Sequence, residues 1–270
     1  MAAKQLRVLV VDDSPTVRSV LARKLDESPQ ISVVGKAADG VEAIRLAREL
    51  EPDVITLDVE MPRMDGLSAL ESLMRERPTR VVMVSSLTKA GADATLRALE
   101  LGAVDFIEKP VFGGVAAPHR IADDLIDKVI AASGARLRPP APKRSAAARP
   151  AAPAGARPST RSAGWLDRWV VIGASTGGPQ ALRQVLGDLP GDLGVPVLVV
   201  QHMPPHFTRS LAERLDADCA VTVQEARPGS QLAAGLVLIA PGGFHMQVDA
   251  QGVCSLNEDP TECGVRPAST

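Results

Sequence analysis

The chain of 270 residues is long enough for two domains, and its 45% hydrophobic content is that of a globular protein. A formal net charge of −2 gives no whole-chain argument for nucleic-acid binding, and no run approaches the ~20 apolar residues of a membrane span. The three cysteines lack C-x-x-C spacing, which favours reduced thiols over a disulfide framework or a zinc site. We therefore expect a soluble cytoplasmic protein without membrane insertion.

Short apolar runs alternate with helical periods in the first block, residues 6–125. Continuous apolar strands separated by helices indicate a parallel sheet covered on both faces, so the block is assigned to the α/β class with a doubly wound sheet. At the first helix, Ser14 is the expected cap and Pro15 the first helical residue. The predicted strands cover 6–11, 31–37, 53–58, 79–86 and 104–109, and the predicted helices cover 14–28, 40–50, 66–76, 91–102 and 119–132.

Charged residues stand at the ends of these strands. Asp12 and Asp13 follow the first strand, while Asp58 ends the third and Lys109 ends the fifth. Because ligands of open parallel sheets bind beyond the carboxyl ends of the strands, we expect these groups at one edge. Crowded carboxylates favour a hard cation such as Mg²⁺, and a carboxylate beside Mg²⁺ and a lysine can attack a phosphoryl group. Taken singly, each Asp has turn formation or helix capping as its alternative role.

Four runs, VLVVDDS, LDVEMPRMDG, VMVSS and IEKP, together resemble a response-regulator receiver domain over residues 6–125. The resemblance implies a flavodoxin-like fold with Asp58 as the phosphoacceptor. It also implies that Asp12 and Asp13 bind Mg²⁺ together with Asp58, and that Lys109 contacts the phosphoryl group.

The same resemblance assigns the residues of a phosphorylation switch. Ser85 is the better match for the hydroxyl that moves toward the phosphoryl group, and Ser86, one residue on, is the alternative. Phe106 matches the aromatic switch position, with plain core packing as its alternative role. In the loop after Asp58, Gly66 is expected to allow a turn that a side chain would resist.

Residues 136–164 separate the two blocks and differ from both in composition. They hold six Pro, nine Ala and seven Lys or Arg, with no acidic residue. Because this segment cannot bury enough apolar surface to offset its ordering entropy, we predict a disordered linker. Its role is that of a solubilising tether or of a basic segment that docks on an acidic surface.

The second block, residues 165–270, opens with the run VVIGASTGGP, a strand that leads into a glycine-rich turn. Two phosphate-binding patterns fail here, because Ser175 stands where a dinucleotide fingerprint needs Gly and no Lys follows as in a Walker loop. A serine nucleophile on a tight turn fits better, with backbone N–H groups at the helix start near Pro179 facing an oxyanion. The alternative is a glycine-rich strand–helix turn in which Ser175 has no catalytic role.

A nucleophilic serine needs a base, and the next predicted strand, within VPVLVVQHM, ends at His202. If the two strands are neighbours, Ser175 and His202 emerge at the same sheet edge, within reach of a hydrogen bond. A structural histidine is the alternative for His202 taken alone. A helix from Pro205 and two further strands follow, so the block is predicted to be a second doubly wound parallel-sheet domain.

The runs IGASTGGPQAL, QHMPPHFTRSLAERLD and APGGFHM, behind a receiver domain and a linker, resemble the chemotaxis protein-glutamate methylesterase family, CheB. The resemblance implies a Rossmann-like catalytic domain that acts on methylated glutamates of a chemoreceptor's cytoplasmic helices. Ser175 would attack the ester carbonyl with His202 as base, methanol would leave, and water would release the glutamate. The family also deamidates receptor glutamines, and hydrolysis needs no cofactor beyond the receiver's Mg²⁺.

The chain departs from the family pattern near its end. The family's triad closes with an aspartate in a glycine-rich segment downstream of the histidine, whereas this sequence stops at ECGVRPAST, which resembles a segment before it. Asp218, Asp249 and Asp259 stand outside the family's context, so the role passes to none of them. The expectation is a catalytic domain that is incomplete at its C-terminus, and losing a triad acid alone costs up to ~10⁴ in turnover.

Three functions from different classes are weighed. The first is a phosphorylation-activated hydrolase, in which the unphosphorylated receiver covers the Ser175–His202 edge and phosphorylation of Asp58 uncovers it. The second is a non-catalytic, phosphorylation-dependent module that binds the receptor or kinase, favoured by the missing aspartate segment. The third is a DNA-binding response regulator, which no recognition-helix pattern supports. We adopt the first, with methylated chemoreceptor helices and a chemotaxis histidine kinase as partners and no nucleic acid.

Overall fold

The computed structural model describes residues 5–86, 88–109, 118–137, 168–261 and 266–267. Contacts divide the chain into two units, Met1–Ala141 and Pro142–Thr270, and each unit is described by itself. Apart from its first two residues, the predicted linker 136–164 lies outside the described residues.

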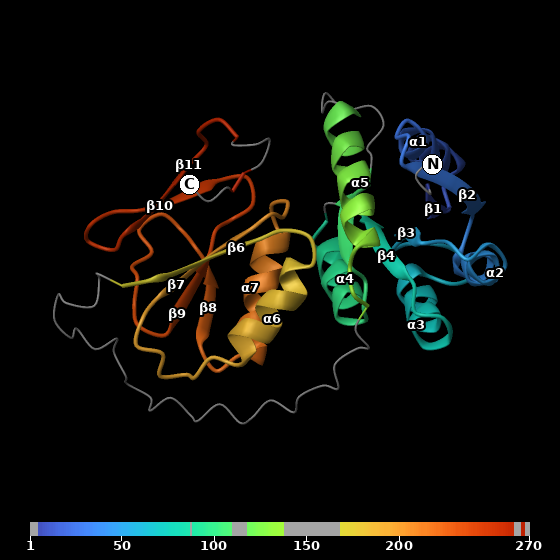
Figure 1. The fold of residues 1–270 in the computed structure, drawn as a ribbon. Helices are drawn as coiled ribbons and strands as arrows, with labels where there is room; N and C mark the ends of the chain where they lie inside the picture. The colour runs from blue at the N-terminus through green and yellow to red at the C-terminus, as the bar shows by residue number, and fades with distance from the viewer. Residues whose placement is uncertain (1–4, 87, 110–117, 138–167, 262–265, 268–270) are drawn as a thin grey trace. The chain divides into compact units, whose positions relative to one another are not determined.

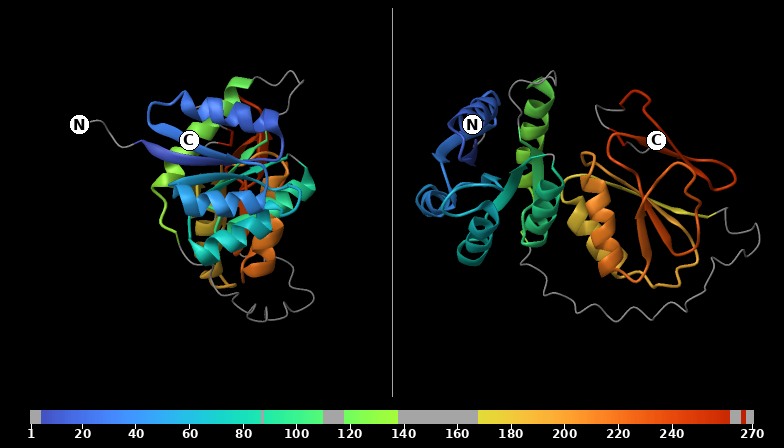
Figure 2. Two further views of the ribbon diagram at one scale, coloured as in Figure 1. Left: turned by 90° about the vertical axis from the view of Figure 1, so that its right-hand side faces the viewer. Right: turned by 180° about the vertical axis from the view of Figure 1, so that it is seen from behind.

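The first unit holds a five-stranded parallel sheet in the described residues, with helices on both faces (Figures 1 and 2). Its elements are β1 (Leu6–Val11), α1 (Pro15–Asp26), β2 (Ile31–Ala37), α2 (Gly40–Leu50), β3 (Val54–Asp58), α3 (Gly66–Glu76), β4 (Arg80–Ser85), α4 (Lys89–Glu100), β5 (Asp105–Glu108) and α5 (Pro118–Ser133). The strand order is β2-β1-β3-β4-β5. Helix α1 contacts α5, and α3 contacts both α2 and α4, so the helices form two layers. This is the predicted doubly wound fold.

Aliphatic side chains fill the first unit on both faces of the sheet. The four residues Val8–Val11 are fully buried, and all of β3 is buried. Helix α1 begins as predicted, because the Ser14 hydroxyl accepts a hydrogen bond from the Val17 N–H and Pro15 is the first helical residue. Two-sided coverage explains why these strands read as continuous apolar runs.

The second unit, over residues 168–261, combines a four-stranded parallel sheet with two helices and an antiparallel strand pair. Its elements are β6 (Val170–Ala174), α6 (Gly178–Gly187), β7 (Val197–Gln201), α7 (Phe207–Asp218), β8 (Thr222–Glu225), β9 (Leu236–Ile239), β10 (His245–Val248) and β11 (Cys254–Asn257). The order β6-β7-β9-β8 leaves β6 at an edge. Helices α6 and α7 lie side by side, away from the β10–β11 pair (Figure 1). That pair covers Leu198 and Leu238 of the sheet with Met246, Val248, Cys254 and Leu256.

The second unit differs from the sequence expectation in two places. Helix α7 begins at Phe207 rather than Pro205, because Pro205 and His206 form a turn in which His206 has a φ of 73°. The β10–β11 pair was not predicted, since its strands of four residues each carry polar side chains at alternate positions. In the described part of the chain, no helix has both the length and the apolar character needed to cross a bilayer.

Candidate phosphorylation and active sites

The carboxyl ends of β1, β3 and β5 bring four charged side chains together in the first unit. The Lys109 ammonium nitrogen lies 2.6 Å from Asp58 Oδ2 and 3.2 Å from Asp12 Oδ2. Asp13 Oδ1 lies 3.8 Å from the same nitrogen. Asp12 and Asp58 are buried, whereas Asp13 is exposed. The four charged groups therefore lie together as predicted, and the Lys109 ammonium forms ion pairs with all three carboxylates.

The electrostatics of this cluster fit a hard divalent cation. One oxygen from each carboxylate lies within 4.8 Å of the others. Burial raises the pKa of Asp58 to about 6, although the hydrogen bond from Lys109 opposes the rise. Burial also raises the pKa of Asp12, against the charge of Lys109 and the hydrogen bond from the Ser14 N–H. Because oxygen ligands suit Mg²⁺ and its charge would relieve this cost, Asp12, Asp13 and Asp58 are the residues that would hold it.

Lys109 is kept charged by the same cluster. Burial alone lowers the pKa of its ammonium, but the hydrogen bond and charge of Asp58, with the charge of Asp12, raise the pKa overall. The ammonium is thus available to neutralise a phosphoryl group on Asp58.

The two candidate switch serines both lie beside Asp58. Ser85 and Ser86 line a cavity of about 30 Å³ together with Asp58 and Lys109. Ser85 is 1% exposed, and its hydroxyl donates to the Gly91 carbonyl at 3.2 Å, with the Ser86 carbonyl a second acceptor at 3.5 Å. Both acceptors are neutral carbonyls, so a phosphoryl group on Asp58 would offer this hydroxyl a stronger, charged acceptor.

Phe106 is enclosed in the core of the first unit. Its side chain is 2% exposed, and the Lys128 ammonium nitrogen lies 5.1 Å from the ring centroid. The same nitrogen donates to the Phe106 carbonyl at 2.7 Å. The ring is therefore in an inward position, which suits both core packing and an inactive switch.

Gly66 has a different role from the one predicted. Its φ is not positive, so the turn itself does not require glycine. A Cβ at this position would instead lie 2.0 Å from the Asp58 carbonyl oxygen. The requirement for glycine is therefore the close approach of the α3 start to the backbone of Asp58.

In the second unit, Ser175 and His202 follow neighbouring parallel strands. Strands β6 and β7 pair with Ala174 opposite Gln201, and the His202 N–H donates to the Ala174 carbonyl at 3.1 Å, which extends the ladder by one residue. Neighbouring strands lie about 5 Å apart, and opposed residues of a sheet share a face. The register therefore places the backbone of His202 beside the end of β6, one residue before Ser175. Ser175 is exposed and His202 is half-buried.

Two features of the turn after Ser175 bear on the predicted nucleophile turn. The left-handed residue is Gly177, with a φ of 74°, and the φ of Ser175 is not positive. The Gly178 N–H, expected to face an oxyanion, donates to the Ser175 carbonyl at 2.7 Å. Since Pro179 has no N–H, the N–H groups of Thr176 and Gly177 are the ones to consider for an oxyanion site.

Gln201, which the sequence did not single out, hydrogen-bonds the backbone of both candidate catalytic residues. This side chain is 1% exposed, and its Nε2 donates to the Ser175 carbonyl at 3.1 Å and to the His202 carbonyl at 3.2 Å. The available signal was a large polar residue at the end of an otherwise apolar strand, directly before the candidate base.

A second missed group, Thr208, fastens the loop behind His202. Its hydroxyl donates to Glu225 Oε1 at 2.7 Å and accepts from the Gly242 N–H at 3.0 Å, and the side chain is fully buried. A Cβ on Gly242 would lie 2.5 Å from the Met203 carbonyl oxygen. The loop after β9 thus packs directly on the loop that follows His202.

The acids left unassigned by the sequence lie in other surroundings. Asp218 ends α7 and forms an ion pair with Arg183 of α6 at 2.9 Å. Asp249 accepts backbone hydrogen bonds inside the turn between β10 and β11, and Asp259 follows β11. These positions give none of the three a contact with His202 that would recommend it as the triad acid.

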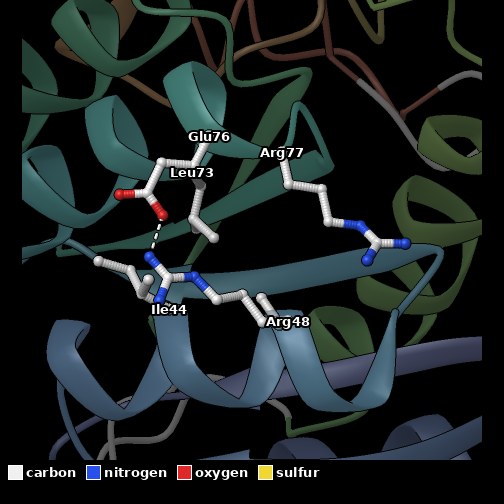
Figure 3. A pocket seen from close by; sticks show the side chains of 6 residues that line it. Ile44, Arg48, Leu73, Glu76 and Arg77 are labelled. Carbon is white, nitrogen blue, oxygen red and sulfur yellow. Dashed lines mark hydrogen bonds and ion pairs between the residues drawn. The ribbon is translucent and has the colours of Figure 1, made fainter.

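A cavity of about 370 Å³ lies between α2 and α3, and none of the candidate residues lines it. Figure 3 shows Arg48 reaching from α2 to an ion pair with Glu76 of α3. Arg77 forms another ion pair with Glu51 at 2.6 Å. The six residues that line this cavity include no nucleophilic side chain.

Comparison with known proteins settles the family. A family model described as CheB methylesterase matches residues 170–269, and one for the response regulator receiver domain matches residues 8–114. A protein-glutamate methylesterase/protein-glutamine glutaminase of Symbiobacterium thermophilum is 50% identical over 98% of this chain and 75% of its own length. The corresponding protein of Bordetella parapertussis is 50% identical over 92% of this chain and 69% of its own length. The chain belongs to the CheB methylesterase family.

A solved structure of the response regulator domain of Thermotoga maritima CheB is also similar to this CheB-family chain. It is 48% identical, covers 49% of this chain and 99% of its own chain, and has a TM-score of 0.46. The relatives named here are enzymes by name, and none favours the binding-module alternative.

Proposed function

We propose that this phosphorylation-regulated methylesterase removes methyl groups from glutamate methyl esters on chemoreceptors and deamidates receptor glutamines, with Ser175 as nucleophile and His202 as base. The observation that carries the assignment is the backbone register, in which the His202 N–H bonds to the residue before Ser175. The exposure of Ser175 supports it, because a receptor helix must reach the nucleophile.

The chemistry divides into two steps. In the first, the Ser175 oxygen bonds to the ester carbonyl carbon, His202 takes the hydroxyl proton, and the C–O bond to methoxide breaks as that proton passes to it, giving methanol. In the second, water attacks the acyl-enzyme with His202 again as base, which frees the glutamate and restores the serine. A receptor glutamine follows the same course and loses ammonia.

The receiver unit supplies the control. Asp58 would accept a phosphoryl group from a chemotaxis histidine kinase, with Mg²⁺ held by Asp12, Asp13 and Asp58 to neutralise the developing charge. Lys109 would contact the phosphoryl group, and the Ser85 hydroxyl and Phe106 ring would respond to it. The unphosphorylated receiver restrains hydrolysis, and phosphorylation releases it. The enzyme acts in the cytoplasm, where the receptor helices and the kinase lie.

Methanol release from membranes that carry a methylated chemoreceptor tests the assignment of the nucleophile. Under phosphorylating conditions the wild-type chain releases methanol, and Ser175→Ala lowers release by at least about 10³-fold. Ser255→Ala removes an exposed hydroxyl from β11 of the same unit and serves as the matched control. Equal release by wild type and Ser175→Ala contradicts the assignment, and no release by wild type favours the binding module.

A further inference from the structure

We infer that Gln201 is a positioning residue that holds the turn carrying Ser175 and the backbone of His202 in one fixed relation. The inference rests on the proposed function of Ser175 and His202 and adds a residue to that site. Gln201 is the last residue of β7, directly before His202 and opposite Ala174, which directly precedes Ser175.

Both amide hydrogens of Gln201 are used within the site. Nε2 donates to the Ser175 carbonyl at 3.1 Å and to the His202 carbonyl at 3.2 Å. The Ser175 carbonyl also accepts from the Gly178 N–H at 2.7 Å, while the His202 N–H donates to the Ala174 carbonyl at 3.1 Å. One planar group therefore fixes the distance between the two backbone segments that carry the nucleophile and the base.

The other end of the amide is fitted to the start of α6. Gln201 Oε1 is buried with no hydrogen-bond partner among the described residues. A Cβ on Gly178 would lie 1.8 Å from this oxygen, so only glycine leaves room for the amide. A residue that merely filled this space would be better apolar, because a buried acceptor without a donor lowers stability. The presence of glutamine despite this cost therefore indicates that its two donated hydrogen bonds have a positioning function.

Without the Gln201 amide, the Ser175 and His202 carbonyls are no longer held at a fixed separation, although both reacting side chains remain. Attack by the serine oxygen depends on its placement relative to the base, and a displacement near 1 Å can cost about 10²-fold. We expect Gln201→Met, which keeps the side-chain length and removes the donors, to lower kcat about 10- to 100-fold with KM unchanged, since a positioning residue makes no contact with the receptor.

A fluorophosphonate reports on Ser175 separately from receptor binding, because the serine oxygen bonds to phosphorus, His202 takes the proton and fluoride leaves. The rate of covalent labelling of the 270-residue chain is measured for wild type, Ser175→Ala, Gln201→Met and Val199→Ala. Val199 is a fully buried residue two positions earlier on β7, so its variant matches the destabilisation without touching the amide. We expect Gln201→Met to label at least 10-fold more slowly than Val199→Ala.

Gly178→Ala supplies an independent variant that leaves Gln201 in place. Its Cβ pushes the amide off the two carbonyls, while alanine is a better helix former than glycine. We expect it to slow labelling as much as Gln201→Met does. In the Gln201→Ala background the same substitution loses its effect, since no amide remains to be displaced.

The outcomes separate the two claims. Labelling of wild type and Gln201→Met at equal rates, or additive effects of Gly178→Ala and Gln201→Ala, overturns the positioning role while leaving Ser175 as the nucleophile. Equal labelling of wild type and Ser175→Ala overturns the proposed function, and the positioning role with it.

Discussion

In the first unit the candidate site side chains contact one another directly. In the second unit the candidate residues are positioned by hydrogen bonds to their main-chain groups. Lys109 reaches the carboxylates of Asp12, Asp13 and Asp58 directly, at 3.2, 3.8 and 2.6 Å. Ser175 and His202 are instead fixed through main-chain groups, by the ladder hydrogen bond to Ala174 and by the amide of Gln201.

The strands that lead to Asp58 and to Ser175 also differ in how far they exclude water, because β3 lies inside its sheet and β6 lies at an edge. The strand β3, which ends in Asp58, is buried along its whole length, while Val170 and Val171 of β6 are 44% and 53% exposed. Burial therefore raises the pKa of Asp58 at the candidate phosphorylation site. At the candidate hydrolytic site Ser175 is exposed, so burial does not act on it as it does on Asp58.

The largest expected effect comes from removing the imidazole of His202, the proposed base. His202→Ala should lower methanol release about 10³- to 10⁴-fold, because the serine oxygen then keeps its proton. Phosphorylation of Asp58 should be unchanged, since that site lies within the other unit. Radiolabelled phosphodonor uptake beside methanol release checks both, and a loss of uptake would show that the two sites are not independently built.

The difference in burial between β3 and β6 predicts that truncating a side chain lowers the free energy of unfolding by different amounts in the two strands. Leu57→Ala in β3, at a fully buried side chain, should cost about 2–5 kcal/mol of unfolding free energy. Val171→Ala in β6, at a half-exposed side chain, should cost less than about 1 kcal/mol. Urea unfolding followed by circular dichroism measures both. Equal costs would mean that β6 is covered in solution.

The raised pKa of Asp58 predicts a pH-dependent stability without metal. The pKa of about 6 in the folded chain lies above the ordinary aspartate pKa of 3.8, so stability falls as the pH rises through this window, and the ionised form carries the full cost above it. In EDTA, Asp58→Asn should therefore be more stable than wild type by about 1–3 kcal/mol at pH 8, with the difference vanishing near pH 4.

Urea midpoints from pH 4 to pH 8 test that expectation. Asp53→Asn is the matched control, because the partly buried Asp53 carboxylate accepts a hydrogen bond from the Arg7 N–H. Added Mg²⁺ should narrow the difference, because the cation stabilises the ionised form in wild type alone. An Asp58→Asn variant that is less stable at pH 8 would mean that the ion pair with Lys109 outweighs burial.

The contrast between the units also explains what the sequence could predict. The receiver fold and its edge of Asp12, Asp13, Asp58 and Lys109 follow from apolar runs that end in charged residues, because topology alone brings strand ends together. Ser175 and His202 were found by the same rule, since each directly follows a strand.

Residues that act through shape or through main-chain contacts left no comparable pattern. The need for glycine at Gly66 is a close approach to the Asp58 carbonyl, which no propensity scale contains. Gln201 and Thr208 act through hydrogen bonds to groups distant in sequence, and only the folded chain shows those partners. The β10–β11 pair escaped because short strands with polar faces resemble loops.

The central claim is that phosphorylation of Asp58 in one unit controls hydrolysis at Ser175 in the other. Methanol release from methylated receptor membranes, with and without a small-molecule phosphodonor and Mg²⁺, tests it in wild type and Asp58→Asn. We predict that the phosphodonor raises release by wild type and leaves Asp58→Asn at the unstimulated rate. Equal rates for the two proteins under phosphorylating conditions would contradict the account.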